Sequence, residues 1–174
     1  SSASPINPVQ LKEQIWENTA QRTKINPGGL NGKPVEAIGE LGDPMQATVF
    51  GMAIGVPDGT EVILAGGTQM LAVAALLRHS GYNKSLLVAT TTYVVHDKFA
   101  QFLDLAKQID VKIYSAPLDF SRSRFTGLSD YEKGYVKEGV GAGGAVWYAE
   151  QLGVPPDRVI KKTEKLYQEM IEKR

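Results

Sequence analysis

Apolar residues follow two alternating patterns along this chain, short continuous runs and runs with helical spacing. The continuous runs predict buried strands over 61–65, 85–90 and 111–115, and the helical spacing predicts helices over 69–77 and 97–109 between them. Successive parallel strands need a crossover connection, which is usually a helix. The alternation therefore predicts an α/β fold, a Rossmann-like three-layer sandwich with a parallel sheet and helices on both faces, in a single domain over residues 1–174.

Further helices are expected on either side of this alternating segment. Their predicted ranges are 8–23, 35–41, 44–54, 130–136, 142–152 and from Pro155-Pro156 towards the end. Residues 25–34 and 118–129 are expected to be irregular. In three of the helices we expect these residues to face inward: Met45, Val49, Met52 and Ala53; Phe99, Phe102, Leu103 and Ala106; and Val159, Leu166, Met170 and Ile171.

Composition excludes several classes of protein. The chain has 19 Lys and Arg against 19 Asp and Glu, so no global field favours nucleic acid or an anionic membrane. It has no cysteine for a disulfide or thiolate site, and its two histidines, His79 and His96, are too few and too far apart for a zinc cluster. No apolar run reaches the roughly 18 residues that a membrane helix needs. We expect a cytoplasmic globular protein with no metal or cofactor and no nucleic-acid or membrane partner.

A glycine-rich segment beside a carboxylate is the strongest chemical signal. Glu138 precedes Gly139, Gly141, Gly143 and Gly144, and an apolar helix follows. Glycines let backbone N–H groups approach a ligand closely, and a helix N-terminus favours an anion. The segment therefore predicts a phosphate site with an acid/base group beside it. The alternative is a loop whose glycines allow a tight turn, with Glu138 paired to Lys137 or Lys133.

Two strand ends carry small and hydroxyl residues that could belong to the same site. The first predicted strand runs into Gly66, Gly67 and Thr68, and the second ends in Thr90, Thr91 and Thr92. Ligands of open α/β sheets bind outside the carboxyl ends of the strands. The alternatives are a plain turn with Thr68 as N-cap, and threonines that merely continue the strand. His96 is expected to start the next helix.

Four ordered blocks resemble one known family. They are Gly42-Asp43-Pro44-Met45-Gln46, Leu64-Ala65-Gly66-Gly67-Thr68-Gln69-Met70, Leu118-Asp119-Phe120-Ser121 and Lys137-Glu138-Gly139-Val140-Gly141-Ala142-Gly143-Gly144. In this order they look like the carboxyl-terminal half of the archaeal and cyanobacterial homologues of nicotinate-nucleotide–dimethylbenzimidazole phosphoribosyltransferase. That resemblance implies an amino-terminal half absent here, so a processed or truncated product is expected and a site built from both halves would be incomplete.

The resemblance also implies a reaction. Ribose 5-phosphate passes from nicotinate mononucleotide to 5,6-dimethylbenzimidazole or a related base, which gives α-ribazole phosphate for the lower ligand of cobamides, and no metal is needed. By its position in the block, Glu138 matches the catalytic base of the family. The backbones of Gly66, Gly67, Gly141, Gly143 and Gly144 with Thr68 are expected to hold the phosphate. The bacterial relatives are homodimers, which implies the same here.

Three other residues of the four blocks could either contact the ligand or have a structural role. Asp43 could contact ribose, although N-cap of the following helix is its simplest role. Asp119 and Ser121 could approach the ligand or hold their loop together. The residues at the two strand ends differ from those of the bacterial enzymes, which leaves base specificity open. The function alternatives are a nucleotide- or phosphoribose-binding α/β protein with another acceptor, and a non-catalytic binding fragment.

Overall fold

A computed structural model describes residues 9–97, 101–130 and 139–173. Its strands are β1 (Val62–Ala65), β2 (Leu86–Thr91) and β3 (Lys112–Ala116). Its helices are α1 (Val9–Thr23), α2 (Pro34–Leu41), α3 (Pro44–Gly55), α4 (Thr68–His79), α5 (Thr92–Val95), α6 (Phe102–Ile109), α7 (Thr126–Ser129), α8 (Ala142–Gln151) and α9 (Pro156–Glu172).

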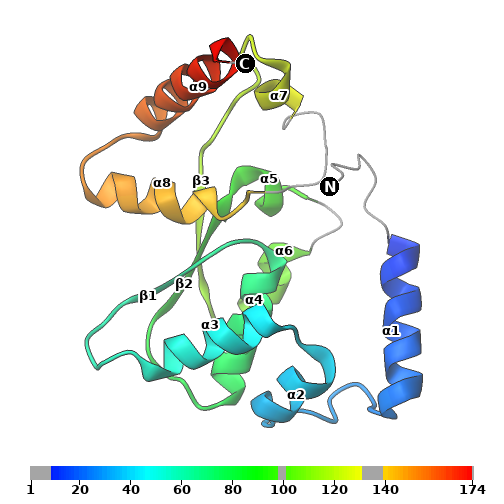
Figure 1. Cartoon of the computed structure of the whole chain (residues 1–174). Coiled ribbons are helices and arrows are strands. Elements are labelled where there is room, and N and C mark those ends of the chain that lie inside the picture. The colour runs from blue at the N-terminus through cyan, green and yellow to red at the C-terminus, as the bar shows by residue number, and fades with distance from the viewer. Residues whose placement is uncertain (1–8, 98–100, 131–138, 174) are drawn as a thin grey trace.

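The three strands form one parallel sheet in the order β1-β2-β3 (Figure 1). Leu64 of β1 pairs with Val88 of β2, and Val88 pairs with Ile113 of β3. Helix α4 connects β1 to β2, and α5 and α6 lie between β2 and β3 along the chain. The predicted parallel α/β arrangement is therefore confirmed.

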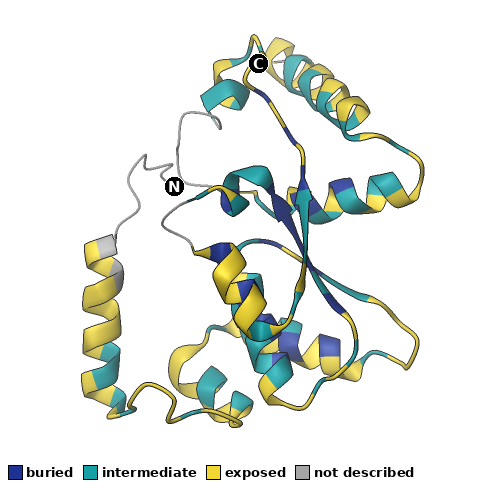
Figure 2. Ribbon diagram, turned by 180° about the vertical axis from the view of Figure 1, so that it is seen from behind, coloured by how far each residue is buried: buried dark blue, intermediate teal, exposed yellow. Residues whose placement is uncertain are grey.

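Helices cover both faces of the sheet, and each face has its own apolar cluster. On one face Leu64, Val88 and Ile113 pack with residues of α3, α4 and α6. On the other, Tyr114 and Ala116 pack with Val146 of α8. Because successive side chains of a strand point to opposite faces, Ile113 and Tyr114 serve different clusters. Figure 2 shows the buried residues concentrated along the strands and on the helix sides that face them.

The helix predicted over 97–109 is wrong at its start. The backbone turns into α5 at Thr92, and His96 closes this helix by donating its N–H to the carbonyl of Thr92 at 3.0 Å. His96 therefore ends a helix rather than starting one. Helix α6 begins at Phe102, and residues 98–100, with Phe99, lie outside the described residues. The predicted helix over 130–136 lies almost wholly outside them, and α7 interrupts the segment expected to be irregular.

Five side chains predicted to face inward are exposed: Met52, Leu103, Leu166, Met170 and Ile171. In α3 the contact with the core comes from Phe50, Ala53 and the partly buried Val49, of which Ala53 and Val49 were predicted to face inward. Helix α9 packs through Val159 and Ile160 in its first turns, and none of its described residues is buried. Apolar spacing correctly identified an apolar side on each helix. The rest of the described chain packs against only part of that side, so some of its residues are exposed.

An exposed ion pair joins the turn after α3 to the segment before β2. Lys84 Nζ lies 2.7 Å from Asp58 Oδ1, and this hydrogen bond and its charge lower the pKa of Asp58 while raising the pKa of Lys84. A lowered carboxyl pKa stabilises the fold above the unfolded value and loses this effect as the pH falls through the folded value. We expect Lys84→Met to return the pKa of Asp58 to its ordinary range, with little change in stability because the pair is solvated. A carbon-detected NMR titration of Asp58 measures this, and an unchanged pKa would contradict the pairing.

Candidate functional site

Three segments predicted to form the site meet at the carboxyl edge of the sheet. They are the turn from β1 into α4, the end of β2, and the segment that leads into α8. A Cβ placed on Gly67 would lie 3.3 Å from the Cγ2 of Val140, and one on Gly141 would lie 3.4 Å from the carbonyl oxygen of Ala65. Figure 1 shows α8 beginning near this edge. The structure therefore brings the two glycine segments into contact although they lie far apart in the sequence.

Gly143 and Gly144 set the close approach of α8 to the sheet. A Cβ on Gly143 would overlap the backbone of Thr90, and one on Gly144 would overlap the side chain of Ala65. The amides of Ala142, Gly143 and Gly144 donate to the carbonyls of residues 139, 140 and 141 at 2.9, 3.1 and 3.0 Å. These glycines thus have a packing role in this structure, with their amides already engaged. Their phosphate role stays a prediction.

The turn between β1 and α4 presents its donors differently. Gly66 is buried and donates its N–H to the carbonyl of Ala89 at 3.0 Å, which extends the β1–β2 ladder by one residue. Gly67 is the N-cap, so the prediction of Thr68 as N-cap is wrong, and Thr68 is the exposed first residue of α4. The first N–H groups of a helix have no acceptor within the helix, so they can donate hydrogen bonds to a bound anion. The first amides of α4 are therefore the better phosphate donors of the two glycine segments.

Thr90 and Thr91 end β2 with two buried hydroxyls. Their side chains are 0% and 1% exposed, and neither Oγ1 has a hydrogen-bond partner among the residues that the structure describes. Neighbouring strand residues point to opposite faces, so the two hydroxyls flank the strand end on both sides. A buried hydroxyl without a partner costs about 1–3 kcal/mol, and such groups call for an explanation. Partners supplied by a bound ligand would provide one.

We expect Thr91→Val to raise the free energy of unfolding by about 1 kcal/mol, because it removes a buried hydroxyl without a partner and keeps the shape of the side chain. Chemical denaturation in urea measures the change. Thr163→Val is the matched control: the Thr163 hydroxyl donates to the carbonyl of Val159 at 2.9 Å, so its loss should bring no gain. A clear loss of stability in Thr91→Val would show that the hydroxyl has a structural partner.

Asp43 has the capping role expected of it. Its Oδ1 accepts the N–H of Gln46 at 2.8 Å, and the Gln46 side chain accepts the N–H of Asp43 at 3.2 Å. This reciprocal capping box closes the start of α3. We expect Asp43→Ala to cost about 1 kcal/mol of stability and Asp43→Ser much less, as thermal unfolding would measure. A ligand-binding loss shared by both variants would instead indicate a ribose contact.

Of the remaining candidates, Asp119 and Ser121 stabilise their own loop. Asp119 Oδ1 accepts the N–H of Ser121 at 2.8 Å, so this pair holds its own loop. Glu138 lies outside the described residues. The next residue, Gly139, has a φ of 72°, in the left-handed region that glycine tolerates, and its carbonyl accepts the N–H of Ala142.

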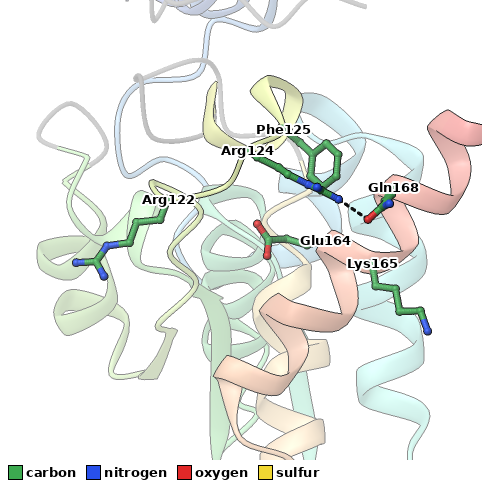
Figure 3. Close-up of a pocket in the computed structure, with 6 residues that line it drawn as sticks. All are labelled: Arg122, Arg124, Phe125, Glu164, Lys165 and Gln168. Atoms are coloured by element: carbon green, nitrogen blue, oxygen red, sulfur yellow. Dashed lines mark hydrogen bonds between the residues drawn. The ribbon is translucent and has the colours of Figure 1, made fainter.

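A surface hollow that sequence reasoning missed lies between the loop after β3 and α9. It has a volume of about 380 Å³ and is lined by Arg122, Arg124, Phe125, Glu164, Lys165 and Gln168 (Figure 3). Arg124 donates to Gln168 and stacks 4.8 Å from the Phe125 ring centroid. Figure 3 shows Arg122 and Lys165 pointing away from the Glu164 carboxylate. The two arginines at 122 and 124 were the sequence signal for this hollow. Their side chains do not converge on one point, as the cations of an anion site would.

Within ranges 9–97, 101–130 and 139–173, no three His, Asp or Glu side chains gather as metal ligands would. In the same part of the chain, every helix is too short or too polar to cross a membrane.

Similar proteins come from several archaea. The chain is 52% identical over 172 residues to a UPF0284 protein of Pyrococcus furiosus, covering 98% of this chain and 51% of that protein. It is 44% identical over 168 residues to a UPF0284 protein of Methanosarcina acetivorans (94% and 48%), and 40% over 173 residues to one of Saccharolobus islandicus (98% and 47%). No family model matches the chain. The chain is thus a homologue of archaeal UPF0284 proteins and spans about half of their length.

Proposed function

We propose that the carboxyl edge of this sheet binds nicotinate mononucleotide and takes part in phosphoribosyl transfer to 5,6-dimethylbenzimidazole or a related base. One observation carries the proposal that a ligand binds here. Thr90 and Thr91 place two buried hydroxyls, which have no hydrogen-bond partner among the described residues, beside the Gly66-Gly67 turn, where open α/β sheets bind ligands. The resemblance of the Glu138 block to the phosphoribosyltransferase family supports the choice of reaction.

The parts of the ligand can be assigned by their chemistry. The phosphate goes to the amides that begin α4, behind Gly67, where the helix dipole favours an anion. Ribose hydroxyls both donate and accept hydrogen bonds, as the hydroxyls of Thr90 and Thr91 do. With the phosphate and the ribose held by these groups, C1′ is fixed relative to the incoming ring, which lowers the entropic part of the barrier.

The reaction is one substitution at C1′ of the ribose. A benzimidazole nitrogen forms the new N–C1′ bond on one face of the sugar. On the other face the bond from C1′ to nicotinate breaks, and its electron pair returns to the pyridinium ring, which leaves as neutral-ring nicotinate. The second benzimidazole nitrogen loses its proton to the Glu138 carboxylate. A positioned carboxylate of this kind is a usual general base.

The test uses this chain alone and co-expressed with the remaining half of the Pyrococcus furiosus UPF0284 protein. Each preparation is incubated with nicotinate mononucleotide and dimethylbenzimidazole, and α-ribazole phosphate and nicotinate are separated by chromatography. The proposal predicts equal amounts of both products in at least one preparation. Binding of the nucleotide without either product would favour an acceptor of another class. If neither preparation binds the nucleotide or forms product, the proposal is contradicted.

A further inference from the structure

Three large apolar side chains in the first half of helix α1 are exposed. Leu11, Ile15 and Trp16 are 54%, 56% and 48% exposed. Leu11 and Ile15 lie one turn apart on one side, and Trp16, about 100° further around the helix, widens this apolar side near the middle of α1. None of the described side chains of α1 is buried, and Figure 2 shows the helix exposed almost throughout.

The polar contacts between α1 and the other described elements lie at the end of this helix. Arg22 Nη2 donates to the carbonyl of Glu40 at 2.9 Å, and Arg22 Nη1 lies 3.9 Å from the Glu40 carboxylate. Figure 1 shows the rest of α1 standing apart from the sheet and its covering helices. A helix of 15 residues is marginal in water without tertiary contacts. Its apolar side therefore needs a covering surface.

The sheet also is small for a fold of its class. Parallel sheets occur almost always with both faces covered, and sheets usually have about 4–6 strands. Here three strands are described, so β1 and β3 each leave one edge without a described partner strand. More polypeptide is thus expected beside this chain.

We propose that the apolar side of α1 docks on the half of the polypeptide that the archaeal UPF0284 relatives have beyond the region matched by this chain. The chain is 52% identical to the Pyrococcus furiosus protein yet spans only 51% of it. In such a protein the unmatched half is tethered to the half that this chain matches. The effective concentration of the tethered half, on the order of millimolar, exceeds the concentration of a separate copy. A tethered surface would therefore cover α1 before a second copy does. This proposal does not depend on the reaction proposed above.

The experiment co-expresses this chain with the remaining half of the Pyrococcus furiosus protein, and separately with that of the Thermococcus gammatolerans protein. Light scattering after size exclusion is expected to show a one-to-one complex. Hydrogen exchange is expected to slow in α1 relative to the chain alone. The triple variant L11Q/I15Q/W16Q is expected to bind about 100-fold more weakly, since large buried aromatic and aliphatic side chains dominate such interfaces.

The double variant E13Q/E17Q on the polar side of α1 is the matched control, with binding expected to change less than about twofold. Because the three apolar residues are exposed in the chain alone, the triple variant should keep the circular dichroism of the chain core. Three results would overturn the proposal. The first is the absence of a complex with either half, and the second is a complex that the triple variant leaves intact. The third is a homodimer of this chain in which α1 is already protected from hydrogen exchange.

Discussion

Replacement of Gly143 by alanine should destabilise the protein by about 3 kcal/mol or more. The new Cβ would overlap the backbone of Thr90 in the central strand, and a backbone cannot move aside as a flexible side chain can. Relief requires α8 to shift away from the sheet, which would open its contact with Ala116 and Tyr114 through Val146. Denaturation in urea, followed by circular dichroism, measures the loss.

Gly51→Ala is the matched control for this substitution. Gly51 lies in α3, and nothing outside its own helix lies within 4 Å of an added Cβ. Alanine is the better helix former by about 1 kcal/mol, so this variant should be more stable than the parent. The same chemical change is thus expected to act in opposite directions at the two sites. Equal effects would contradict the close approach of α8 to β2.

Replacement of Glu138 by glutamine should lower the rate of product formation by about 10²–10⁴-fold if Glu138 is the general base. The amide keeps the size of the side chain but cannot accept the benzimidazole proton. The nucleotide should still bind, because its phosphate and ribose contacts come from other residues. Initial rates of α-ribazole phosphate formation, with the nucleotide affinity measured in parallel, separate the two effects.

Glu150→Gln is the control for a carboxylate outside the reaction. Glu150 of α8 accepts a hydrogen bond from the Tyr114 hydroxyl, and burial followed by this bond raises the pKa of Tyr114. Its replacement should alter the titration of Tyr114 while leaving the rate nearly unchanged. A Glu138→Gln variant as active as the parent would remove Glu138 from the role of base.

The positions of the strands could be predicted from the sequence because short buried strands form continuous apolar runs. Each of the three predicted strands agrees with the structure within one residue at either end. The Asp43 cap was also predictable, since capping depends on residues only three apart. The meeting of Gly67 with Val140 follows from a general property of parallel sheets, whose carboxyl ends share one edge.

Features that depend on what covers a surface could not be predicted. Apolar spacing placed Met52 and Leu166 inward, but the described chain leaves them 68% and 47% exposed. The break at His96 had no strong local signal, because the residues around it fit either a strand end or a helix. Glycine has the same sequence signal in a phosphate loop and in a tight helix contact, so only the three-dimensional structure distinguishes the packing role of Gly143.

The most direct test is a calorimetric titration of nicotinate mononucleotide into the parent chain and into T90V/T91V, each alone and co-expressed with the remaining half of the Pyrococcus furiosus protein. We expect the parent to bind, and the double variant to bind at least about tenfold more weakly while being more stable, because the removed hydroxyls gain partners only from the ligand. Equal affinity in both proteins would contradict a ligand site at this edge of the sheet.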